Sequence, residues 1–216
     1  MVSSSVSFDR LTRDDFDMTI EFLNYITKDS SGAHFSKCRK YRFTLWRKWT
    51  DVFDQKPVHL AEMVAFICLN PSTADERKND ATVTRCVNYS KAWGGRGFIM
   101  LNLFPFRATD PNDMKAESGG MFNSNMKIVS ELAPLVKKVV CGWGNHGSFQ
   151  DADYKMFDTL SGIGLQLNYL RLTGEGCPQH PLYLPKDLEP QPWLKNERKK
   201  IQASKLPAPV LEVPDM

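Results

Sequence analysis

The chain has 216 residues, a length that fits one α/β domain with terminal extensions better than two complete domains. Its composition, 42% hydrophobic and 25% charged, excludes wholesale disorder, a collagen-like chain and a coiled coil. The 28 basic and 25 acidic side chains leave a formal net charge of +3, which by itself demands no polyanionic partner.

Membrane insertion, secretion and metal binding find no support in the sequence. No apolar run approaches the roughly 18–20 residues that cross a bilayer, and the N-terminal stretch resembles no signal peptide, so we expect a cytoplasmic protein. Because the cysteines form no C-x-x-C pair and the four histidines are dispersed, we predict buried thiols, no metal site and no cofactor. The cysteines are Cys38, Cys68, Cys86, Cys141 and Cys177.

Two patterns mark the N-terminal part of the chain. Residues 11–26 place apolar side chains on one face and predict a helix after a loose, serine-rich start. Residues 37–48 carry six cations and no acid, with three aromatic side chains between them. Their alternation predicts a strand or the edge of a hairpin. The basic face of that strand is either simply solvated or a phosphate-contacting surface, and the pattern allows both.

The centre of the chain alternates apolar segments with amphipathic ones. Continuously apolar strands that alternate with helices are typical of a parallel sheet covered on both faces. We therefore predict an α/β fold, a three-layer α/β/α sandwich with a central, mostly parallel sheet of four strands. The strands are expected within residues 62–70, 97–102, 137–145 and 166–173, and the helices within 81–93, 121–137 and 148–161.

Composition divides the chain into three parts. Residues 1–36 would hold the N-terminal helix and its flexible start, and residues 37–184 the α/β domain. Residues 185–216 are proline-rich and basic, which predicts a solvated tail whose cations would add nonspecific attraction to nucleic acid.

Four segments directly follow the predicted strands: residues 69–75, 101–107, 142–147 and 177–185. Each signal is weak alone, since Asn before Pro is an ordinary turn former and Trp-Gly an ordinary strand exit. In an open parallel sheet, however, ligands bind beyond the carboxyl ends of the strands. The topology therefore predicts that all four segments meet at one rim of the sheet.

The motifs of these segments resemble those of two families. From residue 39 to residue 185 the sequence resembles the uncharacterised bacterial and phage family called domain of unknown function 1643, through YRFTLWRKW, LNPSTAD, DATVTRC, NLFPFRATDP, and GWGNHG with HPLYLP. That family carries no assigned activity. More distantly, motifs in the same order resemble the uracil-DNA glycosylase superfamily. This second resemblance implies a glycosylase-like sandwich and hydrolysis of an N-glycosidic bond.

The glycosylase resemblance assigns roles to individual positions. Asn70 falls on the residue that positions the attacking water, as in the branches that use Asn-Pro-Gly. Asn102 falls on the asparagine that recognises the base, and His180 falls on the histidine that hydrogen-bonds the departing base. Trp143 and Gly144 match a structural strand end. The resemblance thus implies that Asn70 and His180 are the catalytic residues.

The sequence also departs from the glycosylase pattern. Leu182 replaces the serine of His-Pro-Ser, which removes one phosphate contact. Ser72 stands where the uracil-specific branch has a tyrosine, and a small residue there leaves room for a 5-substituent, so we expect a modified pyrimidine. Phe104 and Phe106 either stack on the base or pack in the core.

The residue types suit the hydrolysis of an N-glycosidic bond. Positive charge develops on the sugar and negative charge on the base, so a side chain that holds water and a donor aimed at a base oxygen favour the transition state. Asn70 cannot act as a strong base, which predicts slow turnover unless Asp75 or Asp80 assists. Asn102 presents both a donor and an acceptor, which suits the edge of a flipped pyrimidine. The protonation state of His180 stays open.

The expected function is that of a monofunctional DNA glycosylase acting on a flipped, 5-modified pyrimidine, in phage-DNA processing or anti-phage defence. Two alternatives stay open: a non-catalytic nucleic-acid-binding reader of modified bases, and an enzyme that acts on free nucleotides. The expected partner is single- or double-stranded DNA, with no membrane. The side chains expected to bind its backbone are Arg39, Lys40, Arg42, Arg47 and Arg107.

Overall fold

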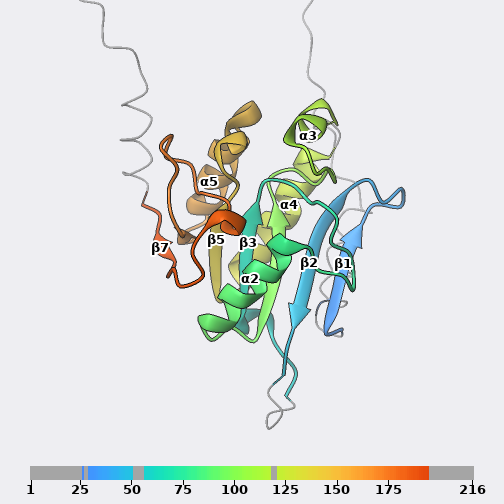
Figure 1. Ribbon diagram of the computed structural model, residues 1–216, viewed down its shortest axis with the longest axis vertical. Coiled ribbons are helices and arrows are strands. Elements are labelled where there is room, and N and C mark those ends of the chain that lie inside the picture. Colours follow the sequence, from blue (N-terminus) through green and yellow to red (C-terminus); the bar gives the residue numbers. More distant parts are fainter. Residues whose placement is uncertain (1–25, 27–28, 51–55, 118–120, 195–216) are drawn as a thin grey trace, which may run out of the picture.

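A single seven-stranded sheet organises the computed structural model, which describes residues 26, 29–50, 56–117 and 121–194 (Figure 1). The strand order is β1-β2-β4-β3-β5-β6-β7. The strands are β1 (Ser31–Phe35), β2 (Arg42–Lys48), β3 (Met63–Cys68), β4 (Gly97–Asn102), β5 (Lys138–Gly142), β6 (Leu167–Tyr169) and β7 (Gln191–Pro192). The helices are α2 (Ala81–Ala92), α3 (Pro111–Glu117), α4 (Phe122–Leu132) and α5 (Ala152–Gly162).

The centre of the sheet is parallel and its flanks are antiparallel. β4, β3, β5 and β6 are neighbours in that order and pair in parallel, which confirms the four strands expected from the apolar runs. The predicted number of strands is wrong, because β1 and β2 form an antiparallel hairpin on one flank and β7 pairs antiparallel with β6 on the other. β2 therefore lies inside the sheet, between β1 and β4, and is not an edge strand.

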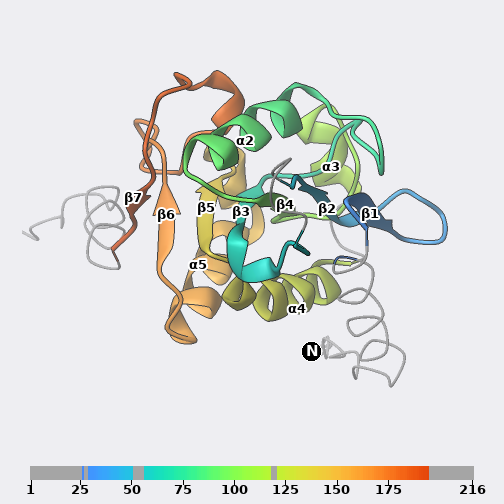
Figure 2. The same ribbon diagram turned by 90° about the horizontal axis from the view of Figure 1, so that it is seen from below.

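Both faces of the sheet are covered by helices, which explains why the strands are apolar throughout. Figure 2 shows α2 on one face and α4 with α5 on the other. The side chains of β3 divide accordingly: Ala65 and Ile67 belong to the core cluster under α4 and α5, whereas Val64 and Phe66 belong to the cluster under α2. The mixed α/β class predicted from the sequence is confirmed.

Local sequence signals explain where the helices begin and end. The Oδ1 atom of Asp80 accepts a hydrogen bond from the Val83 N–H and caps α2. α4 ends at Leu132 and not at residue 137, where the sequence predicted its end, because Pro134 cannot continue it and a short 3-10 turn follows. α3 lies between residues 102 and 121, where the sequence analysis predicts no helix, and Pro111 occupies its first position, where proline is well tolerated.

The sheet extends past both expected domain boundaries, since β1 precedes residue 37 and β7 follows residue 184. Trp193 in the expected tail is 3% exposed and packs its ring 4.7 Å from that of Phe157, so the start of this segment belongs to the fold. The expected N-terminal helix lies outside the described residues except Ile26, which is helical and buried in the core. Residues 195–216 also lie outside them. No helix among the described residues has the length and apolarity needed to cross a membrane.

The cysteines behave as predicted at four of five positions. Cys38 is exposed, contrary to expectation, because it lies in the turn between β1 and β2, away from either core cluster. The buried cysteines are Cys68, Cys86, Cys141 and Cys177.

Candidate functional site

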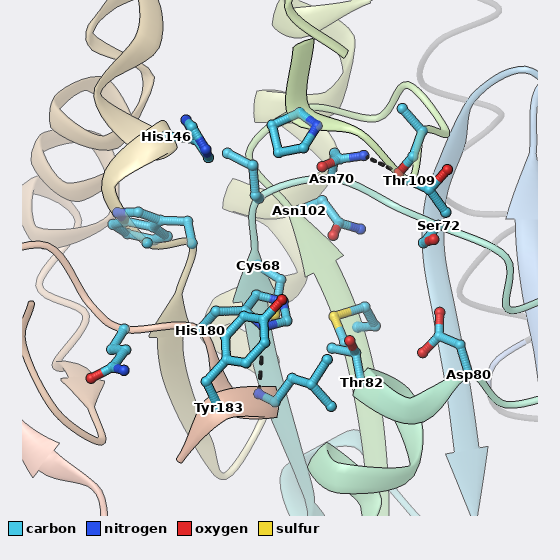
Figure 3. A pocket seen from close by; sticks show the side chains of 18 of the residues that line it. Cys68, Asn70, Ser72, Asp80, Thr82, Asn102, Thr109, His146, His180 and Tyr183 are labelled. Carbon is cyan, nitrogen blue, oxygen red and sulfur yellow. Dashed lines mark hydrogen bonds between the residues drawn. The ribbon is translucent and has the colours of Figure 1, made fainter. Parts of the chain in front are cut away.

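A cavity of about 530 Å³ opens at the carboxyl ends of the parallel strands (Figure 3). All four strand-end segments contribute to its walls, as the predicted topology requires. The volume falls within the range of about 300–1,000 Å³ that is typical of small-molecule sites. Asn70, Ser72, Asn102 and His180, four of the residues singled out in the sequence, line this cavity together.

Asn102 is the last residue of β4 and presents an unpartnered amide to the cavity. The residue is 1% exposed, and neither its Oδ1 nor its Nδ2 has a hydrogen-bond partner among the described residues. A buried polar group without a partner costs about 1–3 kcal/mol, so native proteins rarely keep one without a reason. The Asn102 amide therefore offers one donor group and one acceptor to a molecule that fills the cavity.

Asn125 on α4 holds the main chain at this position. Its Nδ2 donates to the carbonyl oxygens of Asn102 (2.8 Å) and Leu103 (3.0 Å), where β4 ends. Sequence reasoning missed this residue. A signal existed, because Asn125 occupies the same helical face as Ile128, Val129 and Leu132 and is thus a polar residue at a core position.

Asn70 follows β3, and its amide is oriented by the neighbouring loop. Its Nδ2 donates to the carbonyl oxygens of Ala108 (2.8 Å), Pro71 (3.0 Å) and Phe106 (3.4 Å). With the amide nitrogen turned toward these three carbonyls, Oδ1 is the atom left to accept a hydrogen bond, and no described residue supplies one. Figure 3 shows Asn70 and Asn102, from the ends of neighbouring strands, in the same cavity.

His180 precedes a 3-10 turn, η4 (Pro181–Tyr183), and caps it. The Leu182 N–H donates to Nδ1 of His180 (3.4 Å), so the proton of the neutral ring lies on Nε2. This turn packs tightly against β5, since a Cβ on Gly142 would lie 2.8 Å from Cδ of Pro181. Only glycine at position 142 lets the His180 segment approach the strand this closely.

A thiol lies next to the His180 ring at the floor of the cavity. Cys68, the last residue of β3, shares side-chain hydrogen bonds with Cys86 of α2 and with His180, and these lower the pKa of Cys68 to about 6 against the effect of burial. Burial alone would lower the pKa of His180, but its contact with Cys68 and the nearby Asp80 carboxylate raise it. The cap from Leu182 opposes protonation of Nδ1, so a neutral ring donating from Nε2 satisfies both neighbours. Sequence reasoning treated Cys68 only as a buried thiol.

The Trp-Gly strand end follows β5, and both residues line the inner cavity. Trp143 is 2% exposed, and its ring packs 5.8 Å from that of Trp193. Gly144 has φ +68°, a conformation that favours glycine, and its N–H donates to the Pro178 carbonyl (2.7 Å). This bond ties the end of β5 to the segment that carries His180.

A second cavity, of about 690 Å³, adjoins the first and shares Ser72, Ala108 and Thr109 with it. Its walls include Arg39, Lys40, Phe106 and Arg107, four residues that the sequence analysis assigned to the base or the DNA backbone. Phe106 therefore lines this outer cavity and not the inner one. Its ring packs edge-on against Tyr41 at 5.6 Å.

The three outer cations are not equivalent. Arg39 forms a bidentate ion pair with Glu76 (2.8 and 3.0 Å), which neutralises its charge. Arg107 makes no ion pair within the described part of the chain. It donates to the main-chain carbonyls of Ser72 and Arg39 and lies over the Phe35 ring, 5.0 Å from its centroid. Arg107 and the exposed Lys40 are thus the better candidates for binding an anion.

The expectation that Arg42 and Arg47 bind the DNA backbone does not fit the structure, because both side chains turn inward. Arg42 is 2% exposed, and its Nη1 donates to the Ala74 carbonyl (2.9 Å). Burial lowers the pKa of Arg42 to about 10. Arg47 makes five hydrogen bonds to the protein, among them bonds to Asp75 O and Asn79 Oδ1. Its guanidinium is occupied in holding the loop between β3 and α2, so it offers nothing to a DNA backbone. Arg42, by contrast, lines the inner cavity.

Phe104 packs in the core, which was one of the two alternatives for it, and the expected base-binding role does not fit this position. It is fully buried in the core, with its ring 5.7 Å from that of Phe122 and 6.0 Å from that of Phe149, and it lines neither cavity.

The two loop carboxylates lie in different places. Asp80 lines the inner cavity, whereas Asp75 lies outside it and accepts hydrogen bonds from two loop N–H groups. Both Asp80 oxygens accept main-chain N–H donors, from Val83 and Ala74.

Tyr183 is an aromatic residue that sequence reasoning missed. It lines the inner cavity, is 75% exposed, and its ring centroid lies 5.7 Å from that of His180. Its position three residues after His180 in HPLY was the available signal. A large exposed aromatic side chain at the edge of a cavity is a ready stacking surface.

Comparison with known proteins identifies one family. Neither the curated proteins nor the solved structures show a match to this chain. Among the described residues, no group of three or more His, Cys, Asp or Glu side chains could hold a metal ion. A family model does match residues 42–182, well over half of the chain. The chain belongs to the family described as "Protein of unknown function (DUF1643)".

Proposed function

We propose that this chain is a DNA glycosylase-like hydrolase that cleaves the N-glycosidic bond of a flipped, 5-modified pyrimidine, on a sandwich related to the uracil-DNA glycosylase superfamily. The observation that carries the proposal is that the buried Asn102 amide lines the inner cavity and has no hydrogen-bond partner among the described residues. A pyrimidine edge presents neighbouring donors and acceptors, so one amide can bind it with two hydrogen bonds.

Asn70 supports a hydrolytic role beside the base site. Its Nδ2 is held by the loop carbonyls, and its Oδ1 is left as an acceptor. An acceptor of this kind orients a water molecule without deprotonating it strongly. The only carboxylate among the described residues lining the inner cavity, Asp80, is engaged as a helix cap, so slow turnover is expected.

His180 supports departure of the base. With Nδ1 accepting from Leu182, the neutral ring has an N–H at Nε2 that can donate to a base oxygen. That oxygen gains negative charge as the bond breaks, and a donor placed for it stabilises the transition state more than the ground state. Without a base, the same proton interacts with Cys68. Binding of a base would therefore draw the His180 proton away from the thiol.

Ser72 supports the choice of a 5-modified pyrimidine. It lines both cavities, so it stands at the junction between them. Serine is small, so its side chain takes up little of the space at this junction. A substituent on the base would then extend from the inner cavity toward the outer one.

The outer cavity supports DNA over a free nucleoside. Arg107 and Lys40 offer cations that could neutralise phosphates flanking the flipped base, and Tyr183 offers an exposed ring for a neighbouring base. A free nucleoside would occupy the inner cavity and would not contact Arg107, Lys40 or Tyr183.

The test is an oligonucleotide cleavage assay with the full chain. Duplex and single strands carrying uracil, thymine mismatches, 5-hydroxymethylcytosine or glucosylated cytosine are incubated with the protein, then treated with alkali to break abasic sites. We expect cleavage at a 5-modified pyrimidine. Asn102→Leu should reduce kcat/KM by about 100- to 1,000-fold, the usual cost of losing a transition-state donor. Asn123→Ala, on the exposed face of α4, is the matched control and should leave the rate unchanged.

Cleavage that survives Asn102→Leu at full rate would overturn the proposal. So would wild-type turnover of free nucleosides with no effect of the DNA context. The second candidate, a reader without catalysis, is favoured by one observation: both oxygens of Asp80, the one carboxylate among the described residues that line the inner cavity, accept main-chain hydrogen bonds. Binding to modified DNA that weakens steeply with salt, with no cleavage of any substrate, would establish that reader instead.

A further inference from the structure

The inner cavity is lined by a second buried polar side chain with unused donors, Arg42 of β2. The residue is 2% exposed, and its Nη1 donates to the Ala74 carbonyl at 2.9 Å. This is the only side-chain hydrogen bond of Arg42 within the described part of the chain. Its Nε and Nη2 are therefore left without a partner.

The charge of Arg42 also lacks a partner. No ion pair joins its guanidinium to a described carboxylate. Asp80, the one carboxylate among the described residues that line the cavity, uses its two oxygens to accept the Val83 and Ala74 N–H groups. Arginine stays protonated at neutral pH, and a buried charge without a partner is costly. A ligand that brings negative charge into the cavity would reduce that cost.

The unused nitrogens of Arg42 indicate the shape of such a ligand. Nε and Nη2 form one edge of the planar guanidinium, and this edge can donate to two oxygens of one carboxylate or phosphate group. The start of α2 adds to the site, since Thr82 lines the same cavity and its hydroxyl is a further donor. Figure 3 shows Thr82 near Asp80 at this end of α2. A helix N-terminus carries partial positive charge, which favours an anion.

We propose that Arg42 and Thr82 form an oxyanion site in the inner cavity, so that the molecule bound there carries a carboxylate or phosphate group beside the part that Asn102 binds. β2 and β4 pair antiparallel, so the start of β2 lies beside the end of β4. Arg42 and Asn102 occupy these two positions and line one cavity. The site provides a pair of donors for the oxyanion and an amide for the ring.

Two kinds of molecule supply this chemistry. A free nucleotide carries a phosphate, and a modified pyrimidine can carry an acidic substituent on the base. The second case rests on the proposed function and would name the modification, whereas the first would favour an enzyme that acts on free nucleotides. In both cases the oxyanion site is separate from Arg107 and Lys40, which line the outer cavity.

The first experiment follows the arginine Nε–H signals of the ¹⁵N-labelled full chain by NMR during titration with sodium phosphate at constant ionic strength. We expect the Arg42 signal to shift and to saturate, because a phosphate oxygen becomes the acceptor that Nε lacks. The Arg47 signal is the internal control and should stay in place, since its Nε already donates to Asn79 Oδ1 at 2.8 Å. Sodium chloride alone should move neither signal.

This titration uses the unmodified chain, so it does not depend on how a variant folds. An Arg42 signal that ignores phosphate would overturn the proposal. A response confined to the Arg107 signal would also overturn it, because the anion would then occupy the outer cavity.

The second experiment compares three compounds by isothermal titration calorimetry: deoxyuridine, deoxyuridine 5′-monophosphate and 5-carboxydeoxyuridine. At least one of the two acidic compounds should bind about tenfold more tightly than deoxyuridine, the usual gain from a hydrogen bond to a charged group. Arg42→Met should remove this preference and leave the affinity for deoxyuridine nearly unchanged. Thr82→Val should reduce the preference in part, and it serves as the second variant if Arg42→Met does not fold.

The preferred compound identifies the source of the oxyanion. Preference for the monophosphate would indicate a nucleotide, and preference for the 5-carboxy compound would indicate the base. Equal affinity for all three compounds, or a preference that persists in Arg42→Met, would overturn the proposal. If phosphate shifts the Arg42 signal but none of the three compounds binds, the oxyanion site stands and the base site of the proposed function fails.

Discussion

Arg47 and Asn102 are both buried polar side chains on neighbouring strands, β2 and β4, yet they differ in hydrogen bonding. Arg47 makes five hydrogen bonds to the protein. The Asn102 amide makes none among the described residues. Satisfied polar groups hold a structure together, whereas an unsatisfied one that faces a cavity marks where a ligand would add the missing bonds. Polarity and burial alone would have ranked these two residues as equals.

Hydrogen bonding also shows how the basic segment, residues 37–48, is related to the cavity beside it. Residues 37–48 carry six cations, but the two on β2 that are most buried, Arg42 and Arg47, bond to the loop between β3 and α2. That loop contains Ser72 and Asp80, which line the inner cavity. Arg42 and Arg47 therefore hold a loop that forms part of the cavity wall, and Arg42 also lines the inner cavity itself.

The largest expected effect is at Arg47. Arg47→Met would leave several carbonyl oxygens of the loop without a donor, and hydrogen bonds to a charged group contribute about 1.5–3 kcal/mol each. We expect the free energy of unfolding to fall by at least about 3 kcal/mol in urea denaturation. Binding to DNA by the folded fraction should keep its salt dependence. A variant with wild-type stability and a weaker salt dependence would reverse the assignment and make Arg47 a phosphate ligand.

A smaller loss is expected when the Asn70 amide becomes a carboxylate. Asn70→Asp places an oxygen against the Ala108, Pro71 and Phe106 carbonyls in place of a donor. We expect a loss of about 2 kcal/mol at neutral pH. Repulsion raises the pKa of the new carboxyl, so the loss should shrink as pH falls and the group becomes protonated.

Thermal unfolding of Asn70→Asp at pH 5 and pH 8, beside the wild type, checks this prediction. If Asn70 served only to orient water, aspartate would be tolerated, and the better base would raise the hydrolytic rate. A stable and faster Asn70→Asp enzyme would therefore contradict the positioning role that the three carbonyls assign to Nδ2.

Asn102→Leu is expected to act in the opposite direction on stability. Leucine has nearly the shape of asparagine and removes a buried amide that lacks partners, so the free energy of unfolding should rise by about 1 kcal/mol. The same substitution should abolish binding of a base in the cavity. Urea denaturation of the ligand-free protein measures the first effect. A loss of stability would mean that the amide is satisfied within the protein, and the ligand-binding role would lose its basis.

The smallest effect separates Arg107 from Arg39. Arg107→Gln should weaken DNA binding by about 1 kcal/mol and reduce the salt slope by about one phosphate, uniformly across sequences. Arg39→Gln should change less, because Glu76 already neutralises that guanidinium. Fluorescence anisotropy over a salt series compares the two variants. Equal effects would show that the Glu76 ion pair opens when DNA binds.

The repetitive part of the fold was predictable, and its periphery was not. Continuously apolar strands such as Met63–Cys68 can be recognised in the sequence, because both of their faces are buried and every residue is therefore apolar. β7 is two exposed residues long, and β1 reads SGAHF, so neither carries a strong periodic signal. Both depend on pairing with a strand that is already in place.

The candidate site was predictable in position and only partly in role. Asn70, Asn102 and His180 follow strands that were identified correctly, and parallel topology brings such ends to one rim. Cys68 and Tyr183 were missed because a thiol or a tyrosine has no periodic signature, and their relevance comes from residues far along the chain. Phe104 and Phe106 are two residues apart, yet one lies in the core and the other in the outer cavity.

The amino-acid sequence by itself determined the class of the fold, the four parallel strands and the strand ends at which polar residues collect. These properties follow from local periodicity, since apolar residues must be buried and the strand end is where the apolar run stops. Only the tertiary structure decided which of the polar groups are satisfied. Arg47 donates hydrogen bonds to residues about 30 positions away, in the loop after β3. No described residue forms a hydrogen bond with the Asn102 amide. Hydrogen-bond satisfaction depends on contacts between distant segments, and periodicity does not encode those contacts.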